Sequence, residues 1–550
     1  MNLRRSRVRH PTAALAASAI LLCALPVQEA FADDLATSVI AGSRGLSPGD
    51  TTVFTVCESI VRLFEERPDV AWPGYSLAEQ PFLVYVPDCM CLFFNPPAGH
   101  SGFEEPPREW PSLNGAYVFR DGSLPGLVGQ LAFDVDVADT LVVAVGLPEQ
   151  FPAGIEDIEF EIFAYIVHEA FHQYQHTAFE RTSWYREERY PISDAENSAL
   201  AWLEMRILED ALLASSSGDE ETCRHRAGQF VAVRHLRWNI ASEFVRGFER
   251  GKELMEGTAK HVELRAVVGA ASLEYVSEID GTMSPLAGVL PRSSLCELIV
   301  DELVERRGER CLQPQDVPRN RIYAVGSAQC YLLDHLGCEW REAAATGGDD
   351  FSYSELLQKN LEMPDPALEP AARAAMGEYG YDGLLAAAKT AWEEYRRGYS
   401  DALARFESQE GTRVEIVMPT TNVSRSRRTR ERKWLMNAGA SCLCAGFEVY
   451  TARGGGWSFE LHDAGLLELS DWDAGSRKVV IYEPGDLKVS VDGETFQTPP
   501  PHEADYDSLS VAGTCFNLTS DDSGRVSIAD EVVRVWLSDG LSDTGRETGR

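Results

Sequence analysis

Residues 155–179 constrain the fold of this chain more than any other stretch, because they join a helical apolar stripe to two histidines four residues apart. Carboxylates crowd the first turns, where negative charge favours the positive end of a helix dipole. The apolar residues recur at steps of three and four, which is the period of one buried helical face. They are Ile155, Ile158, Ile162, Phe163, Ile166, Val167, Ala170, Phe171 and Tyr174. The sequence therefore predicts a single amphipathic helix.

Residues 168–172 of this stretch read His-Glu-Ala-Phe-His, an H-E-x-x-H motif. On a helix, residues four apart lie on the same face, so the imidazoles of His168 and His172 can converge on one ion at roughly 2.0 to 2.1 Å. Glu169 is turned by about 100° from that face. It can then accept a proton from a water molecule that the ion activates. The alternative is a buried helix with two hydrogen-bonded histidines, and the helical context favours the metal site.

A catalytic zinc site usually has three protein ligands and one open position, so a third ligand must come from elsewhere in the chain. Glu256 is the favoured candidate, within the stretch Glu-Leu-Met-Glu-Gly-Thr-Ala-Lys-His-Val-Glu-Leu at residues 253–264. Its small neighbours predict a helix that packs its backbone close to the first one. Glu196 and Glu204 are the rivals, on a helix that can equally be a plain insertion. His176 continues the row of histidines and is expected outside the ligand set.

The H-E-x-x-H motif followed by a later E-G-x-A resembles the gluzincins, the glutamate-ligand branch of the zincin metallopeptidases. The resemblance rests on these two short motifs. It implies that His168, His172 and Glu256 bind Zn²⁺ and that Glu169 is the general base. It also implies a zincin-like, mostly helical catalytic domain with a small mixed sheet, which acts on a peptide or protein substrate.

Similar folds place a tyrosine or histidine late in the catalytic domain, where it stabilises negative charge that develops on the attacked carbonyl. Tyr323 and His335 are the candidates in this chain. Tyr323 is favoured, because Gly326 three residues later allows a close approach between helices. A tyrosine packed at a helix start is the alternative interpretation.

Residues 1–32 are typical of an export signal. Four arginines precede an apolar run from Ala13 to Val27, and Ala30-Phe-Ala32 fits a small-x-small cleavage site. The run is too short for a stable membrane anchor. We therefore expect a secreted or periplasmic protein without an integral membrane segment.

The net charge of −36 repels nucleic acid and anionic lipid, so neither is an expected partner. Twelve cysteines are present. Some should form disulfide bonds in an exported chain. The C-x-C pairs Cys89/Cys91 and Cys442/Cys444 are expected to be disulfide partners rather than ligands of a structural zinc ion.

The pattern along the rest of the chain predicts an α+β fold in three parts after the signal. Residues 33–150 look mixed, with a helix over 53–66, a strand over 81–87 and strands within 130–145. The strand just before the metal helix either offers an exposed edge to an extended substrate or is an ordinary packed strand. Residues 151–410 read as the helical catalytic part. Residues 411–550 carry short alternating strands and predict a β-rich domain, either sandwich-like or barrel-like.

These patterns together predict an exported zinc metallopeptidase. Two alternatives from other classes stay open. One is a binding protein on a zincin scaffold that holds the metal without turnover. The other is a metal-dependent hydrolase of a non-peptide bond.

Overall fold

A computed structural model describes residues 48–537 of the chain. The gaps in it are residues 87–89, 100–101, 109, 116, 123–131, 138–139, 148–157, 181, 184–185, 280, 282–293, 309–311, 421–422, 430–432, 437–440, 455, 472–473, 498–501 and 530–531. The export signal expected over residues 1–32 lies outside the described residues. Within the described part, every helix is too short or too polar to cross a lipid bilayer.

A small mixed sheet follows the first helix, α1 (Pro48–Glu66). Its strands are β1 (Phe82–Val86), β2 (Met90–Phe94), β3 (Tyr117–Asp121), β4 (Ala132–Val137) and β5 (Thr140–Gly146). The order is β3-β2-β1-β5-β4, with β1 and β5 parallel and the other pairs antiparallel. The mixed sheet is confirmed. β5, which precedes the predicted metal helix, lies between β1 and β4, so the exposed-edge interpretation is wrong for it.

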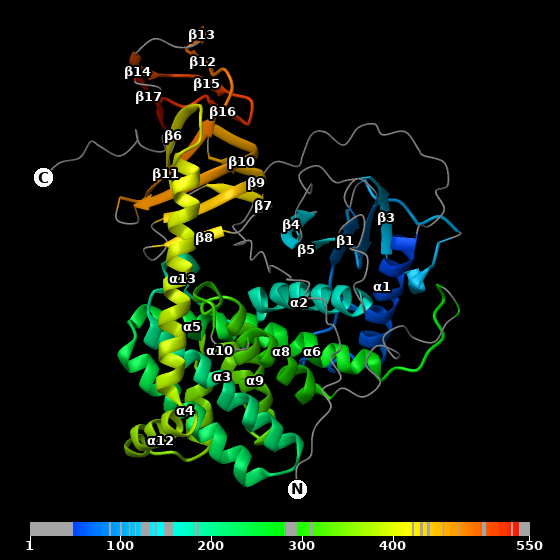
Figure 1. Cartoon of the computed structure of the whole chain (residues 1–550). Coiled ribbons are helices and arrows are strands. Elements are labelled where there is room, and N and C mark those ends of the chain that lie inside the picture. Colours follow the sequence, from blue (N-terminus) through cyan, green and yellow to red (C-terminus); the bar gives the residue numbers. More distant parts are fainter. Residues whose placement is uncertain are drawn as a thin grey trace, which may run out of the picture.

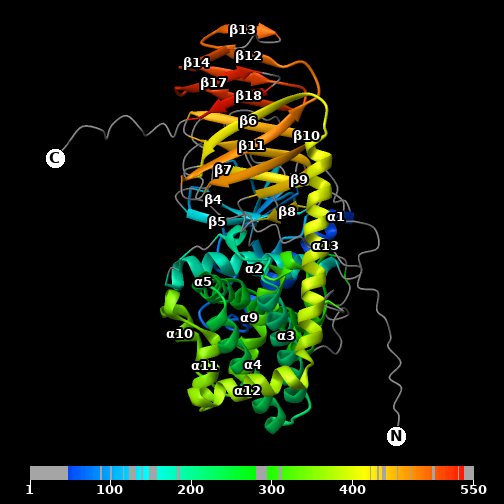
Figure 2. The same ribbon diagram turned by 60° about the vertical axis from the view of Figure 1, so that its left-hand side comes forward.

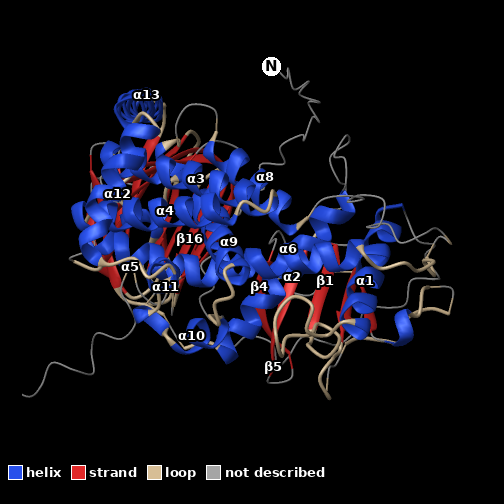
Figure 3. Ribbon diagram, turned by 90° about the horizontal axis from the view of Figure 1, so that it is seen from below, coloured by secondary structure: helices blue, strands red, loops and turns tan. Residues whose placement is uncertain are grey.

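The sheet is buried on both faces. Along β1, Phe82, Val84 and Val86 face the main core of the molecule, while Leu83 and Tyr85 face a smaller apolar cluster on the other side. A strand covered on both faces needs a continuous apolar run, which Phe-Leu-Val-Tyr-Val provides. Figure 3 shows α2 (Ile158–Ala178) lying against this sheet, where it contacts β5.

The helical part surrounds α2. Its long helices are α3 (Ala195–Ser216), α4 (Glu220–Ile240), α5 (Glu243–Lys252), α6 (Thr258–Ala271), α8 (Leu295–Arg307), α9 (Asn320–His335), α12 (Asp365–Glu378) and α13 (Tyr381–Glu407). Two shorter ones, α10 (Arg341–Thr346) and α11 (Tyr353–Asn360), lie between α9 and α12. The predicted metal helix is confirmed from Ile158 onward, and residues 155–157 lie outside the described part.

Helices α5 and α6 join without a break through a π-helical turn, η3 (Glu253–Gly257), which carries Glu256. A π-turn inserts one extra residue into the helical ladder, and such turns are frequent at functional sites. Gly257 of this turn touches Gly326 of α9 so closely that a Cβ built on Gly257 would lie 2.5 Å from the Gly326 Cα. The predicted close approach at both glycines is confirmed. Gly257 itself touches α9, while α6, which carries Ala259, packs against α2 as predicted.

A buried ionic network connects five elements behind this contact. It contains three glutamates and three arginines: Glu204 on α3, Arg234 and Arg237 on α4, Glu249 on α5, Glu253 on η3 and Arg321 on α9. Arg237 Nε lies 2.6 Å from Glu204 Oε1, and Arg234 Nη1 lies 2.9 Å from Glu253 Oε1. Buried charges are tolerated only when they are paired and hydrogen-bonded. The network meets that condition, because its three carboxylates balance its three guanidinium groups in charge.

The chain changes from helix to strand between Glu407 and Thr412. Thirteen strands follow: β6 (Thr412–Pro419), β7 (Ser424–Thr429), β8 (Lys433–Met436), β9 (Ser441–Arg453), β10 (Trp457–Asp471), β11 (Ser476–Glu483), β12 (Lys488–Val491), β13 (Glu494–Gln497), β14 (His502–Tyr506), β15 (Leu509–Ala512), β16 (Phe516–Ser520), β17 (Gly524–Ala529) and β18 (Val532–Trp536). The β-rich part and the α+β class are confirmed. All thirteen strands belong to one hydrogen-bonded sheet, where a sandwich would have two.

Helix α13 connects the two parts and runs from the helical region up beside the β-rich region (Figures 1 and 2). Its last turns bury Tyr399, Ala402 and Phe406 against Leu443 of β9 and Leu467 of β10. Through this apolar contact the sheet packs against α13.

No disulfide joins any two of the nine cysteines that the structure describes. Cys442 and Cys444 lie two residues apart on β9, so their side chains stand side by side on one face. The Cα spacing of about 6.6 to 6.8 Å across two strand residues is at the upper limit of disulfide geometry, and parallel side chains do not bring the sulfurs together. The expectation for this pair is wrong, and Cys89 lies outside the described residues.

The contact between the two glycines generates a prediction about stability. Gly257→Ala should destabilise the helical part by roughly 1 to 3 kcal/mol, because the added methyl group would clash with the backbone of Gly326, which cannot move away as a side chain could. The expected readout is a melting temperature that is lower by several degrees. Gly377→Ala, on the exposed face of α12 with open space around it, is the matched control and should not lower the melting temperature. Equal melting temperatures for Gly257→Ala and the wild type would contradict the prediction.

Candidate metal centre

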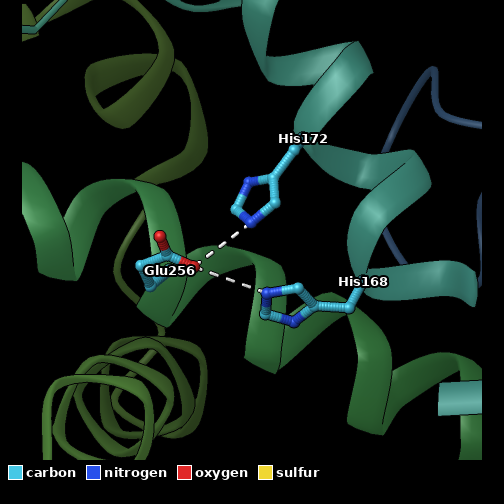
Figure 4. A group of neighbouring side chains, drawn as sticks. All are labelled: His168, His172 and Glu256. Carbon is cyan, nitrogen blue, oxygen red and sulfur yellow. Dashed lines mark ion pairs between the residues drawn. The ribbon is translucent and has the colours of Figure 1, made fainter. Parts of the chain in front are cut away.

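His168 and His172 of α2 and Glu256 of η3 point toward one another (Figure 4). Glu256 Oε2 lies 3.5 Å from His168 Nε2 and 3.2 Å from His172 Nε2. All three ligand atoms lie within 4.8 Å of one another. His168 and Glu256 are buried and His172 is half-buried, so the group has access to solvent on one side only.

The outer nitrogen of each imidazole has a defined partner. His168 Nδ1 lies 3.0 Å from Glu263 Oε2, and His172 Nδ1 lies 2.8 Å from Gln175 Oε1. The Gln175 amide is oriented by its own nitrogen, which donates to the carbonyl of Met255 at 3.0 Å. Both partners are oxygen acceptors, so each Nδ1 carries the hydrogen and each neutral ring presents a lone pair at Nε2.

Three acceptor atoms therefore converge in a largely buried space. Glu256 Oε2 has no hydrogen-bond partner among the described residues. Two imidazole lone pairs and a carboxylate oxygen repel one another unless a proton or a cation lies between them. Two histidine nitrogens and one carboxylate oxygen form a donor set that a divalent ion such as zinc accepts in an open, catalytic type of site. The residues present fit a metal ion.

The pKa values of His168, His172 and Glu256 without a metal reflect the same close approach of the three side chains. Burial lowers the pKa of His168, but the neighbouring carboxylates of Glu256 and Glu263 outweigh it and raise this pKa to about 10. Burial also lowers the pKa of His172, and the charge of Glu256 raises it above its ordinary value. Burial favours the neutral form of Glu256, yet Lys252 and His172 bring its pKa well below the usual range. Protons therefore compete for the position that a cation would take.

Glu169 lies beside this group on α2, and its side chain is half-buried. Its negative charge contributes to the raised pKa values of His168, His172 and Tyr323. A carboxylate that acts on all three must be close to them. Its part in catalysis stays a prediction.

Of the two candidates for stabilising charge on the carbonyl, Tyr323 lies next to His168 of the candidate metal centre, and His335 does not. The Tyr323 ring stacks on His168 with a centroid distance of 5.7 Å and an interplanar angle of 29°. Burial, and then the charges of Glu256 and Glu169, raise the pKa of Tyr323 well above its ordinary value, so its hydroxyl stays a donor. His335 is twelve residues further along α9, about 18 Å by helical rise, and pairs with Glu220 at 2.8 Å.

The rival ligands are used elsewhere. Glu204 is fully buried in the ionic network, where Arg234 and Arg237 hold it. Glu196 is exposed and accepts a long hydrogen bond from the Tyr381 hydroxyl at 3.5 Å. His176 is exposed in the last turn of α2, outside the ligand group, as expected.

Glu263, Gln175 and Lys252 are the site residues that the sequence analysis missed. Lys252 Nζ lies 3.2 Å from the outer oxygen of Glu256. Glu263 is held from behind by Lys260, whose Nζ lies 2.7 Å from Glu263 Oε1. Spacing was the available signal, since Gln175 stands three residues after His172 and Glu263 seven after Glu256, distances that bring helical residues to neighbouring positions.

Comparison with known proteins adds no further constraint: no family model, no curated protein and no solved structure matches this chain.

The contact between Glu263 and His168 generates a prediction about metal binding. Glu263→Ala should weaken zinc binding by about 10- to 100-fold, because the ring of His168 loses the partner that fixes its tautomer and orientation. Competition with a chromophoric chelator measures the affinity. Glu305→Ala, an exposed carboxylate on the neighbouring α8, is the control for lost charge and should bind zinc as the wild type does. An unchanged affinity in Glu263→Ala would show that this contact does not hold the ligand.

The raised histidine pKa values generate a second prediction. A group with a raised pKa holds its proton until the pH approaches that pKa, so zinc must displace a proton at neutral pH. The apparent dissociation constant for zinc should therefore rise by about tenfold for each pH unit between pH 8 and pH 6. Chelator competition at several pH values measures this slope. His462→Ala, which changes an exposed histidine on β10, should show the same slope. An affinity that does not depend on pH would contradict the prediction.

Proposed function

We propose that this protein is an exported zinc-dependent peptidase. One observation carries the proposal: the two imidazoles of the H-E-x-x-H helix and the distant Glu256 carboxylate converge within 4.8 Å of one another. The H-E-x-x-H…E-G-x-A pattern of the gluzincins is compatible with this arrangement. Export is part of the proposal and rests on residues 1–32.

His168, His172 and Glu256 would hold the zinc ion. When bound there, zinc supplies Lewis acidity, which activates water and polarises a carbonyl group. Glu169, which lies beside the ligands, would accept the proton of the attacking water and deliver it to the leaving amine. Both transfers need a carboxylate with access to solvent, and Glu169 is half-buried.

Tyr323 would act on the other charge that develops, the one on the attacked carbonyl oxygen. Its hydroxyl stays protonated at neutral pH and so can donate a hydrogen bond to that oxygen. Preorganised donors of this kind stabilise the transition state more than the ground state, because the negative charge appears only as the reaction proceeds.

The acidic surface of the protein limits the substrate classes. A net charge of −36 disfavours nucleic acid and anionic lipid surfaces. Peptides and proteins are the substrates that agree with both the charge and the site.

The test of turnover is Glu169→Gln. The variant keeps the size of the side chain and removes its basicity, so we expect zinc to stay bound while peptide hydrolysis falls by about 10²- to 10⁴-fold. A casein or peptide-library substrate with a chelator control gives the activity. Full activity in zinc-loaded Glu169→Gln would contradict the role of this residue as the base.

The same experiment includes metal analysis of ligand variants. His168→Ala and Glu256→Ala should each lose stoichiometric zinc, whereas Glu196→Ala, the exposed rival on α3, should retain it. Zinc-loaded wild-type protein without chelator-sensitive cleavage would favour a binding protein. Cleavage restricted to ester or other non-peptide bonds would favour the third class of function.

A further inference from the structure

A shallow, partly open pocket lies directly beside Glu256, and its empty volume of about 200 Å³ includes the solvent at its mouth. Lys252 and Glu256 of the α5–η3 helix form one side, and Tyr323 of α9 together with Arg319, which directly precedes α9, forms another. Glu187 from the segment between α2 and α3 completes the charged lining. The pocket therefore shares Glu256, Tyr323 and Lys252 with the candidate metal centre and adds one cation, Arg319, that this centre does not use.

Among the cations that line the pocket, Arg319 has the most hydrogen-bond donors that no described residue uses. It stands just before the first residue of α9, and its Nε lies 3.3 Å from Glu187 Oε1. No hydrogen bond links its guanidinium to another described residue, and Nε itself is buried. The two terminal nitrogens of an arginine form a planar fork that matches a carboxylate with two parallel hydrogen bonds. Arg319 lines the pocket, and its side chain is 28% exposed.

Tyr323 and Lys252 complete a lining suited to an anion. The Tyr323 hydroxyl makes no hydrogen bond to a described residue, and the ring reaches the pocket from the same helix as Arg319. Lys252 adds a second positive charge on the opposite side, 3.2 Å from the outer oxygen of Glu256.

The balance of charge favours an anion once a metal is bound. Arg319 and Lys252 contribute two positive charges, and Glu187 and Glu256 contribute two negative charges. A divalent cation held by Glu256 and the two histidines would make the surroundings of the pocket net positive. Burial on several sides strengthens such a field, because fewer water molecules screen it.

We propose that this pocket binds a carboxylate of the substrate, with Arg319 as its main partner and Lys252 and Tyr323 beside it. The proposal rests on the proposed peptidase function and specifies the substrate class. Peptides offer this chemistry from two sources, the free C-terminus and the side chains of aspartate and glutamate. The first source would make the protein a carboxypeptidase-type enzyme, and the second would give it a preference for acidic residues.

The experiment measures binding, not turnover. Acetyl-Ala-Ala-Ala as the free acid, the same peptide as its C-terminal amide, and acetyl-Ala-Ala-Asp amide are titrated calorimetrically into zinc-loaded Glu169→Gln protein. At least one of the two acids should bind about tenfold or more tightly than the neutral amide, which is the size expected for a charge-assisted hydrogen bond. A preference for the free acid identifies the C-terminus as the source, and a preference for the aspartyl amide identifies the side chain.

Two variants in the same background assign the preference to Arg319. Arg319→Gln should reduce acid binding to the level of the neutral amide. Arg319→Lys keeps the charge without the fork and should retain only part of the preference. Arg189→Gln removes an exposed arginine of the same segment as Glu187 that does not line the pocket, and it should keep the full preference.

The proposal is overturned if neither acid binds more tightly than the amide, or if both Arg319 variants keep the full preference. It is also overturned if Arg189→Gln loses the preference as completely as Arg319→Gln, since the effect would then be one of overall charge. The outcome is separate from that of the proposed function. Binding is read without turnover, and repetition with metal-free protein shows whether a smaller preference persists when no hydrolysis can occur.

Discussion

The structure depends on one electrostatic constraint: three electron-pair donors meet in a space that is largely closed to water. His168 and His172 present their Nε2 atoms because Glu263 and Gln175 accept hydrogen bonds at the opposite nitrogens. Glu256 meets them from another helix. Such an arrangement is stable only with positive charge at its centre, supplied by protons or by a metal ion. A metal ion at this position would therefore compete with protons.

The scaffold that holds the three donors in place is the packing of α2 and α9 on the α5–η3–α6 helix. Gly257 and Gly326 allow the backbones of η3 and α9 to touch, which places Tyr323 and Glu256 on the same pocket. Behind the contact, Arg321 and Glu249 connect α9 to α5 through the buried ionic network. This network is balanced in charge, so the loss of one member would leave an uncompensated buried ion. The position of the site is thus fixed by elements that do not contact a substrate.

Local sequence patterns predicted much of this arrangement. The periodicity around His168 gave the helix, and the glycines at 257 and 326 indicated close packing. The errors concern long-range pairing. The small residues near Glu256 predicted contact with α2, and α6, which begins directly after Gly257, does pack against α2. They did not predict that Gly257 itself touches α9, because a small residue allows a close approach but does not specify the partner helix. The pair Cys442/Cys444 was expected in disulfides, but a β-strand holds the two side chains parallel. The place of β5 inside the sheet follows from β4, which pairs with it on the other side.

The sequence by itself determined the chemistry of the candidate site: the two histidines a helical turn apart, the acid between them and the short list of possible third ligands. These follow from the 3.6-residue period of a helix, which is a local property. Only the tertiary structure showed which candidates lie beside the two histidines: Glu256 and Tyr323 do. Glu196, Glu204 and His335 have partners elsewhere. Residues more than 80 positions apart in the chain meet through the packing of whole helices. That packing minimises exposed apolar surface and unpaired buried charge over the entire molecule, which no local pattern records.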